Sequence, residues 1–292
     1  MAKGRCKLLA VDVDGTLLHQ GRIDPADADA LRAAAKAGLV VCLCTGRAWL
    51  EVEPIWQSLR LPSPHGPVIC VGGALVAEPD TGRTLYSRPF DRPTAAELAS
   101  AMRRAGYPVM ALVDAWREGF DYFLIGQYDD RELYRRFLHE RDRPLRVRQV
   151  ERLERHIGPR VLRISVLDER VPADGLVRRL RAEFAGRIEV QRIHLLHHDV
   201  HIVEAFAAGA DKFTALVYVG QGYGLGPGSF AAIGDEHNDV AMLRGAGISA
   251  APADAPPEVL AAADIRVAPR GASPVAQFVD IVLGGQPRAE SQ

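Results

Sequence analysis

The stretch LLAVDVDGTLL, Leu8–Leu18, joins an apolar run to two aspartates, Asp12 and Asp14, which are followed by a glycine and a threonine. The run is short and aliphatic, which is typical of a buried strand. In a parallel α/β sheet, ligands bind at the carboxyl ends of the strands. Because neighbouring carboxylates repel each other unless a cation or a substrate offsets their charge, we expect Asp12 and Asp14 to face a binding crevice.

Strand and helix patterns alternate on both sides of the middle of the chain. The N-terminal part predicts strands over 7–12, 40–44 and 68–71 and helices over 24–37 and 48–59. The C-terminal part predicts strands over 230–233, 247–250 and 265–267 and helices over 240–243, 256–262 and 274–283. This alternation predicts an α/β fold: a doubly wound, Rossmann-like parallel sheet with helices on both faces.

The middle of the chain differs in composition and pattern. It is arginine-rich, with predicted helices over 94–105, 130–139 and 172–184 and strands over 109–113, 122–125, 161–167 and 188–194. These elements suffice for a domain of their own. We therefore expect an inserted α/β cap domain over 81–200 within a core formed by 1–80 and 201–292.

Composition narrows the classes of function. The chain has 292 residues, 48% of them hydrophobic and 25% charged, with a net charge of -1. Without a basic excess we expect no nucleic-acid partner. The N-terminal apolar run is too short, and too soon broken by acids, for a signal sequence or membrane span, so we expect a cytoplasmic monomer or small homo-oligomer. The cysteines lack zinc-site spacing and are expected to pack as small hydrophobic side chains.

Two other predicted strands end in polar residues that complement the aspartate pair. The strand over 40–44 runs into a turn at a helix N-terminus, where free N–H groups favour an anion such as phosphate: Thr45, Gly46 and Arg47. The strand over 230–233 is followed by oxygen donors within GDEHNDVAML: Asp235, Asn238 and Asp239. Such hard oxygen ligands beside an anion-binding turn suit Mg²⁺.

Lysine usage points to one further residue. Beyond Lys36, the only lysine is Lys212, and every other basic side chain of the Lys/Arg type is arginine. A single lysine in such a chain indicates a site that needs a compact point charge, which the fork of an arginine would not reproduce.

In this order, VDVDGTLL, CTGR, the lysine of GADKFTAL and GDEHNDVAML resemble the four motifs of the haloacid dehalogenase superfamily, and most of all its Cof-like phosphatases. The resemblance covers essentially the whole chain. It implies an Mg²⁺-dependent phosphatase that acts on small phosphate monoesters, such as sugar phosphates, through an aspartyl phosphate. A phosphomutase or phosphotransferase using the same intermediate is an alternative. A phospho-aspartate signalling module is another, although a large cap suits the gating of water and small substrates.

The resemblance also implies a role for each motif residue. Asp12 would be the nucleophile and Asp14 the general acid and base. Mg²⁺ would be held by the carboxylates of Asp12 and Asp235 and by the backbone carbonyl of Asp14. The phosphoryl group would be held by Thr45, Gly46, Lys212 and Asn238. Asp239 would support Lys212 or a metal-bound water, and Arg47 would lie beside the site or anchor the start of its helix.

Some residues depart from the family pattern, and others are better explained by a structural role than by a functional one. Gly72 in CVGGAL replaces a usual asparagine, and Asp254 replaces the asparagine of a late Asn-Ala pair. The run HLLHHDVH, 194–201, is expected to be a polar hinge strand with His197 and His201 on one face and His198 on the other, rather than a metal site. The glycine-rich loop 220–228 precedes a strand and is expected to be a connector. Trp116 and Tyr122 are candidates for the substrate face of the cap, but the core of the cap is the more frequent place for such aromatic side chains and is expected here.

Overall fold

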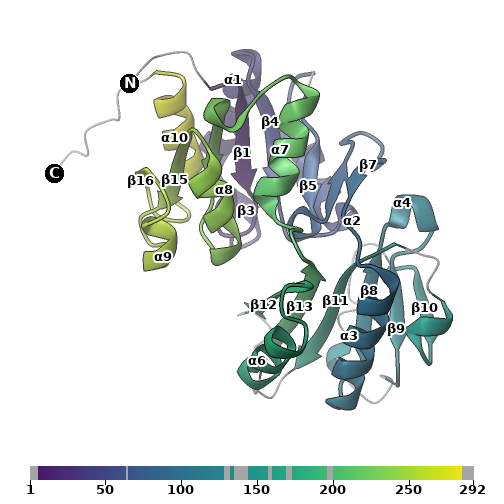
Figure 1. Ribbon diagram of the computed structural model, residues 1–292. Coiled ribbons are helices and arrows are strands. Elements are labelled where there is room, and N and C mark those ends of the chain that lie inside the picture. Colours follow the sequence, from purple (N-terminus) through teal and green to yellow (C-terminus); the bar gives the residue numbers. More distant parts are fainter. Residues whose placement is uncertain are drawn as a thin grey trace. The chain divides into compact units, whose positions relative to one another are not determined.

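The computed structural model describes residues 6–63, 65–127, 132–134, 144–156, 160–168, 173–195 and 200–284. The chain divides into two compact units, and each is described by itself. We call Met1–Tyr86 with Asp211–Gln292 the core unit, and Ser87–Ala210 the inserted unit (Figure 1).

The core unit is built on an eight-stranded sheet in the order β16-β15-β14-β1-β4-β5-β6-β7. Its strands are β1 (Leu8–Asp12), β4 (Val40–Cys44), β5 (Val68–Cys70), β6 (Leu75–Ala77), β7 (Thr84–Ser87), β14 (Phe230–Ile233), β15 (Ile248–Pro252) and β16 (Ile265–Val267). The strands from β16 to β5 run parallel, whereas β6 is antiparallel to β5. Strand β1 lies between two parallel neighbours, and all five of its residues are buried. This burial explains why the strand is an uninterrupted apolar run up to Asp12.

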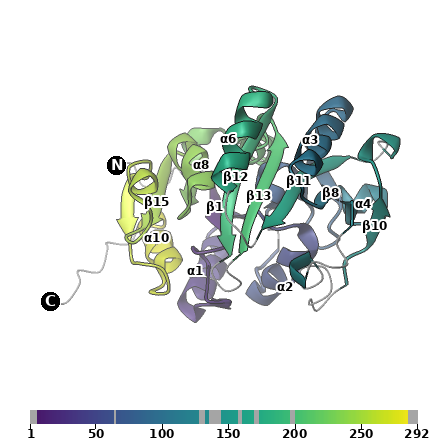
Figure 2. The same cartoon turned by 90° about the horizontal axis from the view of Figure 1, so that it is seen from below.

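Helices cover both faces of this sheet. They are α1 (Pro25–Lys36), α2 (Trp49–Leu59), α7 (Lys212–Gly222), α8 (Val240–Gly245), α9 (Pro257–Leu260) and α10 (Pro274–Val282). Helices α7 and α8 lie on one face, and α1 and α10 pack together on the other (Figures 1 and 2). Asp24 caps α1 by accepting a hydrogen bond from the backbone N–H of Ala26 (2.8 Å), and Pro25 opens the helix.

Shorter elements complete the core unit. Strands β2 (Leu18–His19) and β3 (Arg22–Ile23) form a small hairpin directly after the aspartate pair. Three short 3₁₀ helices are η1 (Val71–Gly73), η3 (Pro227–Ser229) and η4 (His237–Asp239). The last of these lies in the loop that carries three of the expected site residues.

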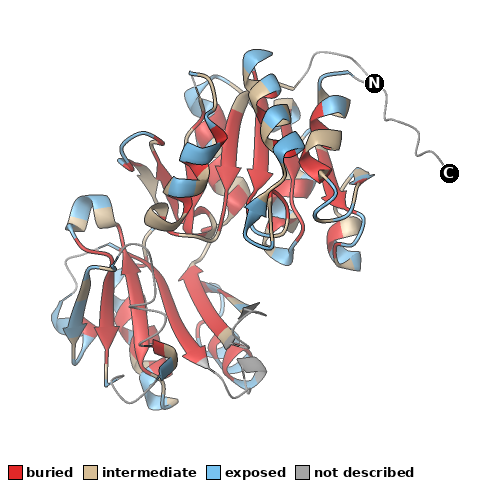
Figure 3. Ribbon diagram, turned by 180° about the vertical axis from the view of Figure 1, so that it is seen from behind, coloured by how far each residue is buried: buried red, intermediate tan, exposed pale blue. Residues whose placement is uncertain are grey.

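The inserted unit has its own six-stranded sheet in the order β10-β9-β8-β11-β13-β12. Its elements are α3 (Arg92–Arg104), β8 (Val109–Val113), α4 (Ala115–Glu118), β9 (Tyr122–Ile125), β10 (Val147–Val150), η2 (Leu153–Arg155), β11 (Val161–Asp168), α6 (Ala173–Glu183), β12 (Ile188–Leu195) and β13 (Val200–Ala207). Helices α3 and α6 pack against the sheet in a hydrophobic core that belongs to this unit alone. Figure 3 shows the buried strands of both sheets.

The predicted fold class, an α/β core with a parallel-dominated sheet and an inserted α/β unit, is confirmed. The boundaries of the units differ from those expected, because β7 extends the core unit to Tyr86 and β13 belongs to the second sheet. The core unit therefore resumes at Asp211 instead of His201.

The prediction of one polar hinge strand over 194–201 is wrong. His194 lies in β12 and His201 in β13, where the two residues are direct partners across antiparallel strands. His197 and His198 lie outside the described residues. Within the helix predicted over 130–139, only residues 132–134 are described, and they are helical. Tyr122 is buried as expected, whereas Trp116 is 53% exposed.

Among the helices of the described residues, none combines the length and the hydropathy that crossing a bilayer requires.

Candidate active site

The carboxyl ends of three neighbouring strands bring the expected site residues to one edge of the core sheet. The strand register pairs Asp12 of β1 with Cys44 of β4, and Val11 with Ile233 of β14. The turn after Cys44 and the loop after Ile233 therefore begin on either side of Asp12. These segments are far apart in the sequence, and the parallel arrangement of the strands brings them together.

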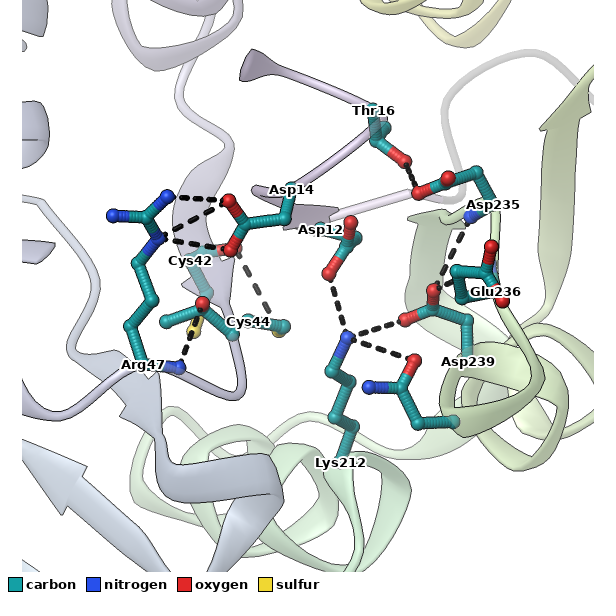
Figure 4. Close-up of polar contacts among 12 residues, drawn as sticks. Asp12, Asp14, Thr16, Cys42, Cys44, Arg47, Lys212, Asp235, Glu236 and Asp239 are labelled. Carbon is teal, nitrogen blue, oxygen red and sulfur yellow. Dashed lines mark hydrogen bonds and ion pairs between the residues drawn. The ribbon is translucent and has the colours of Figure 1, made fainter. Parts of the chain in front are cut away.

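Lys212 is the centre of the buried polar network in Figure 4. Its Nζ donates to Oδ1 of Asp12 (2.6 Å), to Oδ1 of Asp239 (2.7 Å) and, at a longer 3.5 Å, to Oδ1 of Asn238. Its side chain is only 1% exposed. Burial alone would lower the pKa of Lys212, but the charges of Asp12 and Asp239 more than offset this and raise the pKa. The ammonium is therefore protonated at any physiological pH.

The position of Lys212 follows from local structure. It is the first residue of α7, and the helix is capped by Asp211, which accepts a hydrogen bond from the backbone N–H of Thr214 (2.9 Å). The helix also packs against η1 and η4, which follow strands β5 and β14. A long flexible side chain at this position reaches the acidic cluster from a rigid base.

The buried carboxylates of Asp12, Asp235 and Asp239 form a cluster in which one oxygen of each lies within 4.8 Å of the others. Burial is the main cause that raises the pKa of both Asp12 and Asp235, and the charge of Asp239 adds to it. Oδ2 of Asp12 is buried and accepts no hydrogen bond from the described residues. Hard oxygen donors around an acceptor of this kind fit Mg²⁺.

The turn that follows β1 holds the carboxylate of Asp235. The hydroxyl of Thr16, which is buried, donates to Oδ1 of Asp235 (2.7 Å). Gly15 has a φ of +90°, and a Cβ at this position would lie 2.2 Å from Oδ2 of Asp235. Only glycine allows both this backbone conformation and the close approach.

Asp239 organises the loop after β14. Its Oδ2 accepts hydrogen bonds from the backbone N–H groups of Asp235 (3.2 Å) and Glu236 (3.1 Å), while its Oδ1 accepts from Lys212. The side chain thus connects the loop to α7. This is the supporting contact to Lys212 that the resemblance implied, and the structure also places Asp239 in the carboxylate cluster itself.

Asp14 points away from Lys212 and pairs with Arg47 (Figure 4). The guanidinium contacts both carboxylate oxygens, with Nη2 at 2.6 Å from Oδ1 and Nε at 2.9 Å from Oδ2. About half of the Asp14 side chain is exposed. The hydrogen bonds to Asp14 raise the pKa of Arg47. Arg47 therefore contacts a motif aspartate instead of only anchoring the start of α2.

Thr45 and Gly46 form the turn between β4 and α2. Thr45 is buried, and its Oγ1 accepts a hydrogen bond from the backbone N–H of Arg47 (3.1 Å). The start of α2 is held by Glu51, whose side chain accepts from the N–H of Ala48 (2.9 Å). The turn lies directly after Cys44, the strand partner of Asp12.

Thr16 and Arg270 contact the site but were not among the predicted site residues. Nε of Arg270 donates to Oδ2 of Asp235 (2.8 Å), and its Nη2 donates to the backbone oxygen of the same residue (3.2 Å). Thr16 was visible in the motif, and its hydroxyl beside Asp14 was the available signal. Arg270 has no local motif, so only the tertiary structure reveals it.

The two positions that depart from the family pattern differ in their surroundings. Gly72 has a φ of +64°, so a glycine there adopts a left-handed conformation within η1. Asp254 accepts a hydrogen bond from the backbone N–H of Arg270 (2.9 Å). The second departure is therefore connected to the site through Arg270.

Comparison with known proteins identifies the family. The sequence model of the haloacid dehalogenase-like hydrolase family matches residues 9–279. The chain is 25% identical to the 5-amino-6-(5-phospho-D-ribitylamino)uracil phosphatase YwtE of Bacillus subtilis, covering 96% of this chain and 99% of that protein. It is 28% identical to a phosphoglycolate phosphatase of Methanoculleus marisnigri, covering 88% of each chain.

A solved structure agrees with this assignment at the level of the fold. A haloacid dehalogenase-like hydrolase from Bacteroides thetaiotaomicron superimposes with a TM-score of 0.76 at 21% identity, over 95% of this chain and 99% of that one. The match to the family model confirms the resemblance indicated by the four motifs, and together with the relatives named as phosphatases it confirms the prediction of an enzyme. The chain belongs to the haloacid dehalogenase-like hydrolase family.

Proposed function

We propose that this enzyme hydrolyses small phosphate monoesters with the help of Mg²⁺, through an aspartyl phosphate on Asp12. The observation that carries the proposal is the buried contact between Lys212 and Asp12, which leaves Oδ2 of Asp12 without a hydrogen-bond donor among the described residues. A carboxylate fixed in this way at a strand end is oriented for nucleophilic attack.

In the first half of the proposed reaction, an oxygen of Asp12 forms a bond to phosphorus while the ester bond to the leaving group breaks. Asp14, which is paired with Arg47 in this structure, has to be released from that pair and protonated in the substrate complex, and it then gives its proton to the leaving oxygen. Lys212 holds the Asp12 carboxylate and offsets charge on the phosphoryl oxygens. Phosphoryl transfer proceeds through a loose transition state, so positioning and charge neutralisation account for most of the catalysis.

In the second half, Asp14 takes a proton from water as the water oxygen attacks phosphorus. The bond between Asp12 and phosphorus breaks, inorganic phosphate leaves, and the Asp12 carboxylate is restored. We propose that Thr45, Gly46 and Asn238 bind the phosphoryl oxygens in both halves. Thr45 and Gly46 belong to a turn before a helix N-terminus, which favours an anion.

The carboxylates of Asp12 and Asp235 and the backbone carbonyl of Asp14 would hold Mg²⁺, with Asp239 beside them in the acidic cluster. When bound, the metal would neutralise carboxylate and phosphoryl charge. Burial is the main cause that raises the pKa of Asp12 and Asp235, and the charge of Asp239 adds to it; a bound cation would offset that repulsion between the carboxylates.

The names of two relatives support a substrate class. One is named for a phosphorylated ribityl compound and another for phosphoglycolate, and both are small phosphate monoesters. We therefore propose a small phosphorylated metabolite, with sugar phosphates as the first candidates. We also propose that the inserted unit determines which leaving group the enzyme accepts. This unit is a compact domain with its own core, and none of the four family motifs lies within it.

Turnover of p-nitrophenyl phosphate, followed by a panel of phosphorylated metabolites, tests the proposal. We expect hydrolysis that EDTA abolishes and added MgCl₂ restores, with release of inorganic phosphate. Transfer of the phosphoryl group to a second sugar without net release would favour a mutase or phosphotransferase. Hydrolysis that is unaffected by EDTA would contradict the metal assignment.

A further inference from the structure

The carboxylate of Asp235 is held by a resident cation. Nε of Arg270 lies 2.8 Å from Oδ2, and Nη2 lies 3.2 Å from the backbone oxygen of the same residue. Asp235 is only 2% exposed, and the Arg270 side chain is 23% exposed. One guanidinium therefore binds both the side chain and the main chain of one aspartate. Lysine could not make both contacts in this fixed geometry.

Arg270 is itself held in place by acidic neighbours. The backbone N–H of Arg270 donates to Oδ1 of Asp254 at 2.9 Å, and Nη1 lies 3.9 Å from Oδ2 of Asp254. Nη2 lies 3.7 Å from a carboxylate oxygen of Glu236. Asp254 replaces the asparagine that the resemblance to Cof-like phosphatases implies at this position. The additional negative charge at this position thus faces an arginine that also contacts the site.

We propose that Arg270 acts on the metal site through its charge, by way of Asp235: it offsets the charge of the acidic cluster while no metal is bound, and it weakens the binding of Mg²⁺. This inference rests on the proposed function, because Asp235 is the assigned metal ligand. Two observations determine the direction of the effect. Thr16 holds the other carboxylate oxygen at 2.7 Å, so Asp235 stays oriented when Arg270 is removed. The guanidinium lies within contact distance of a ligand oxygen, so it repels a divalent cation at the cluster.

Titration calorimetry with MgCl₂ alone, without substrate, tests this proposal on the full chain. We expect Arg270→Gln to bind Mg²⁺ about tenfold more tightly than wild type, because Coulomb repulsion over a few ångströms is of this order or larger near a protein surface. We also expect this variant to have a lower melting temperature without metal and a larger rise on adding MgCl₂.

A matched control removes a charge nearby. Arg266 in β16 is exposed, and Arg266→Gln should leave the affinity for Mg²⁺ within about twofold of wild type. Arg270→Lys keeps the charge and should also remain within about threefold of wild type. If Arg270→Gln fails to fold, Arg270→Lys still tests the proposal. Tenfold tighter binding of Mg²⁺ by Arg270→Lys would show that the positive charge at this position does not weaken metal binding.

Unchanged or weaker binding of Mg²⁺ by folded Arg270→Gln would overturn the proposal. Asp235→Asn separates this outcome from a failure of the proposed function. If wild type binds Mg²⁺ and Asp235→Asn does not, the metal site stands whatever Arg270 does. If wild type shows no binding that depends on Asp235, the metal assignment itself is wrong, and the inference about Arg270 is overturned with it.

Discussion

Replacing Lys212 with methionine removes the ammonium at the centre of the buried network and keeps a side chain of similar length. In the wild type, Nζ lies 2.6 Å from Asp12 and 2.7 Å from Asp239, and the side chain is 1% exposed. The variant leaves both carboxylates without this partner. We therefore expect Lys212→Met to destabilise the core unit.

The size of the loss follows from burial. Removing one partner of a buried ion pair costs about 3–5 kcal/mol, because the remaining charge is left uncompensated. Two carboxylates lose the same partner here, while the methionine side chain keeps the apolar packing of the lysine stem. We expect a loss of about 4 kcal/mol in the free energy of unfolding. Added MgCl₂ should recover more stability in the variant than in wild type, because the cation replaces the missing charge.

Urea unfolding followed by tryptophan fluorescence measures the loss. Of the three tryptophans, Trp49 and Trp56 belong to the core unit and Trp116 to the inserted unit. A Trp116→Phe background therefore makes the signal specific for the core unit. The control is Lys36→Met, which removes an exposed charge in the last turn of α1. If Lys212→Met unfolds within about 1 kcal/mol of this control, the size of an exposed pair, the network does not stabilise the fold as argued.

Three further perturbations test separate parts of the account. Lys212→Arg keeps the charge but replaces the compact ammonium with a larger planar group, so it should lower turnover by about 100-fold. A loss of only about twofold in steady-state assays would show that the site does not need a compact ammonium. Gly15→Ala should lower the melting temperature far more than Gly38→Ala, since both glycines have a φ of +90° but only a Cβ at Gly15 would collide with Asp235; equal shifts would refute the steric argument. Burial raises the pKa of Asp27 to about 6 from 3.8, so its contribution to stability is fully present below about pH 4 and is lost as pH rises through 6. Asp27→Asn should therefore gain stability relative to wild type between pH 4 and 7. A difference between the urea midpoints of variant and wild type that stays constant over this range would contradict the raised pKa of Asp27.

The fold was predictable where strands are buried on both faces. Strands β1, β4 and β14 are short apolar runs flanked by helices, and their pattern gives both their position and their parallel arrangement. The short strands β6 and β7 carry little periodicity and were missed. Strand β13 was missed because Glu204 interrupts its apolar pattern. In the structure this charge is buried against Arg163 of β11 at 2.8 Å, which only the folded sheet provides.

In the candidate site, too, some residues could be predicted from the sequence and others could not. Asp12, Lys212, Asp235 and Asp239 were predicted from motif order and from strand ends, and they form one network in the structure. The contacts to Asp235 from Thr16 and Arg270 could not be predicted. They join residues 219 and 35 positions apart, and each depends on side-chain directions that no local pattern encodes.

The most direct test of the central claim is to trap the covalent intermediate on Asp12. Enzyme mixed with p-nitrophenyl phosphate and MgCl₂ would be quenched within a single turnover and treated with borohydride, which reduces an acyl phosphate to the alcohol. Peptide mass spectrometry would then locate the product. We predict homoserine at position 12, and none in Asp12→Asn, while Asp29→Asn at an exposed position of α1 retains it. Modification at Asp14 instead, or turnover without any modified aspartate, would contradict nucleophilic catalysis by Asp12.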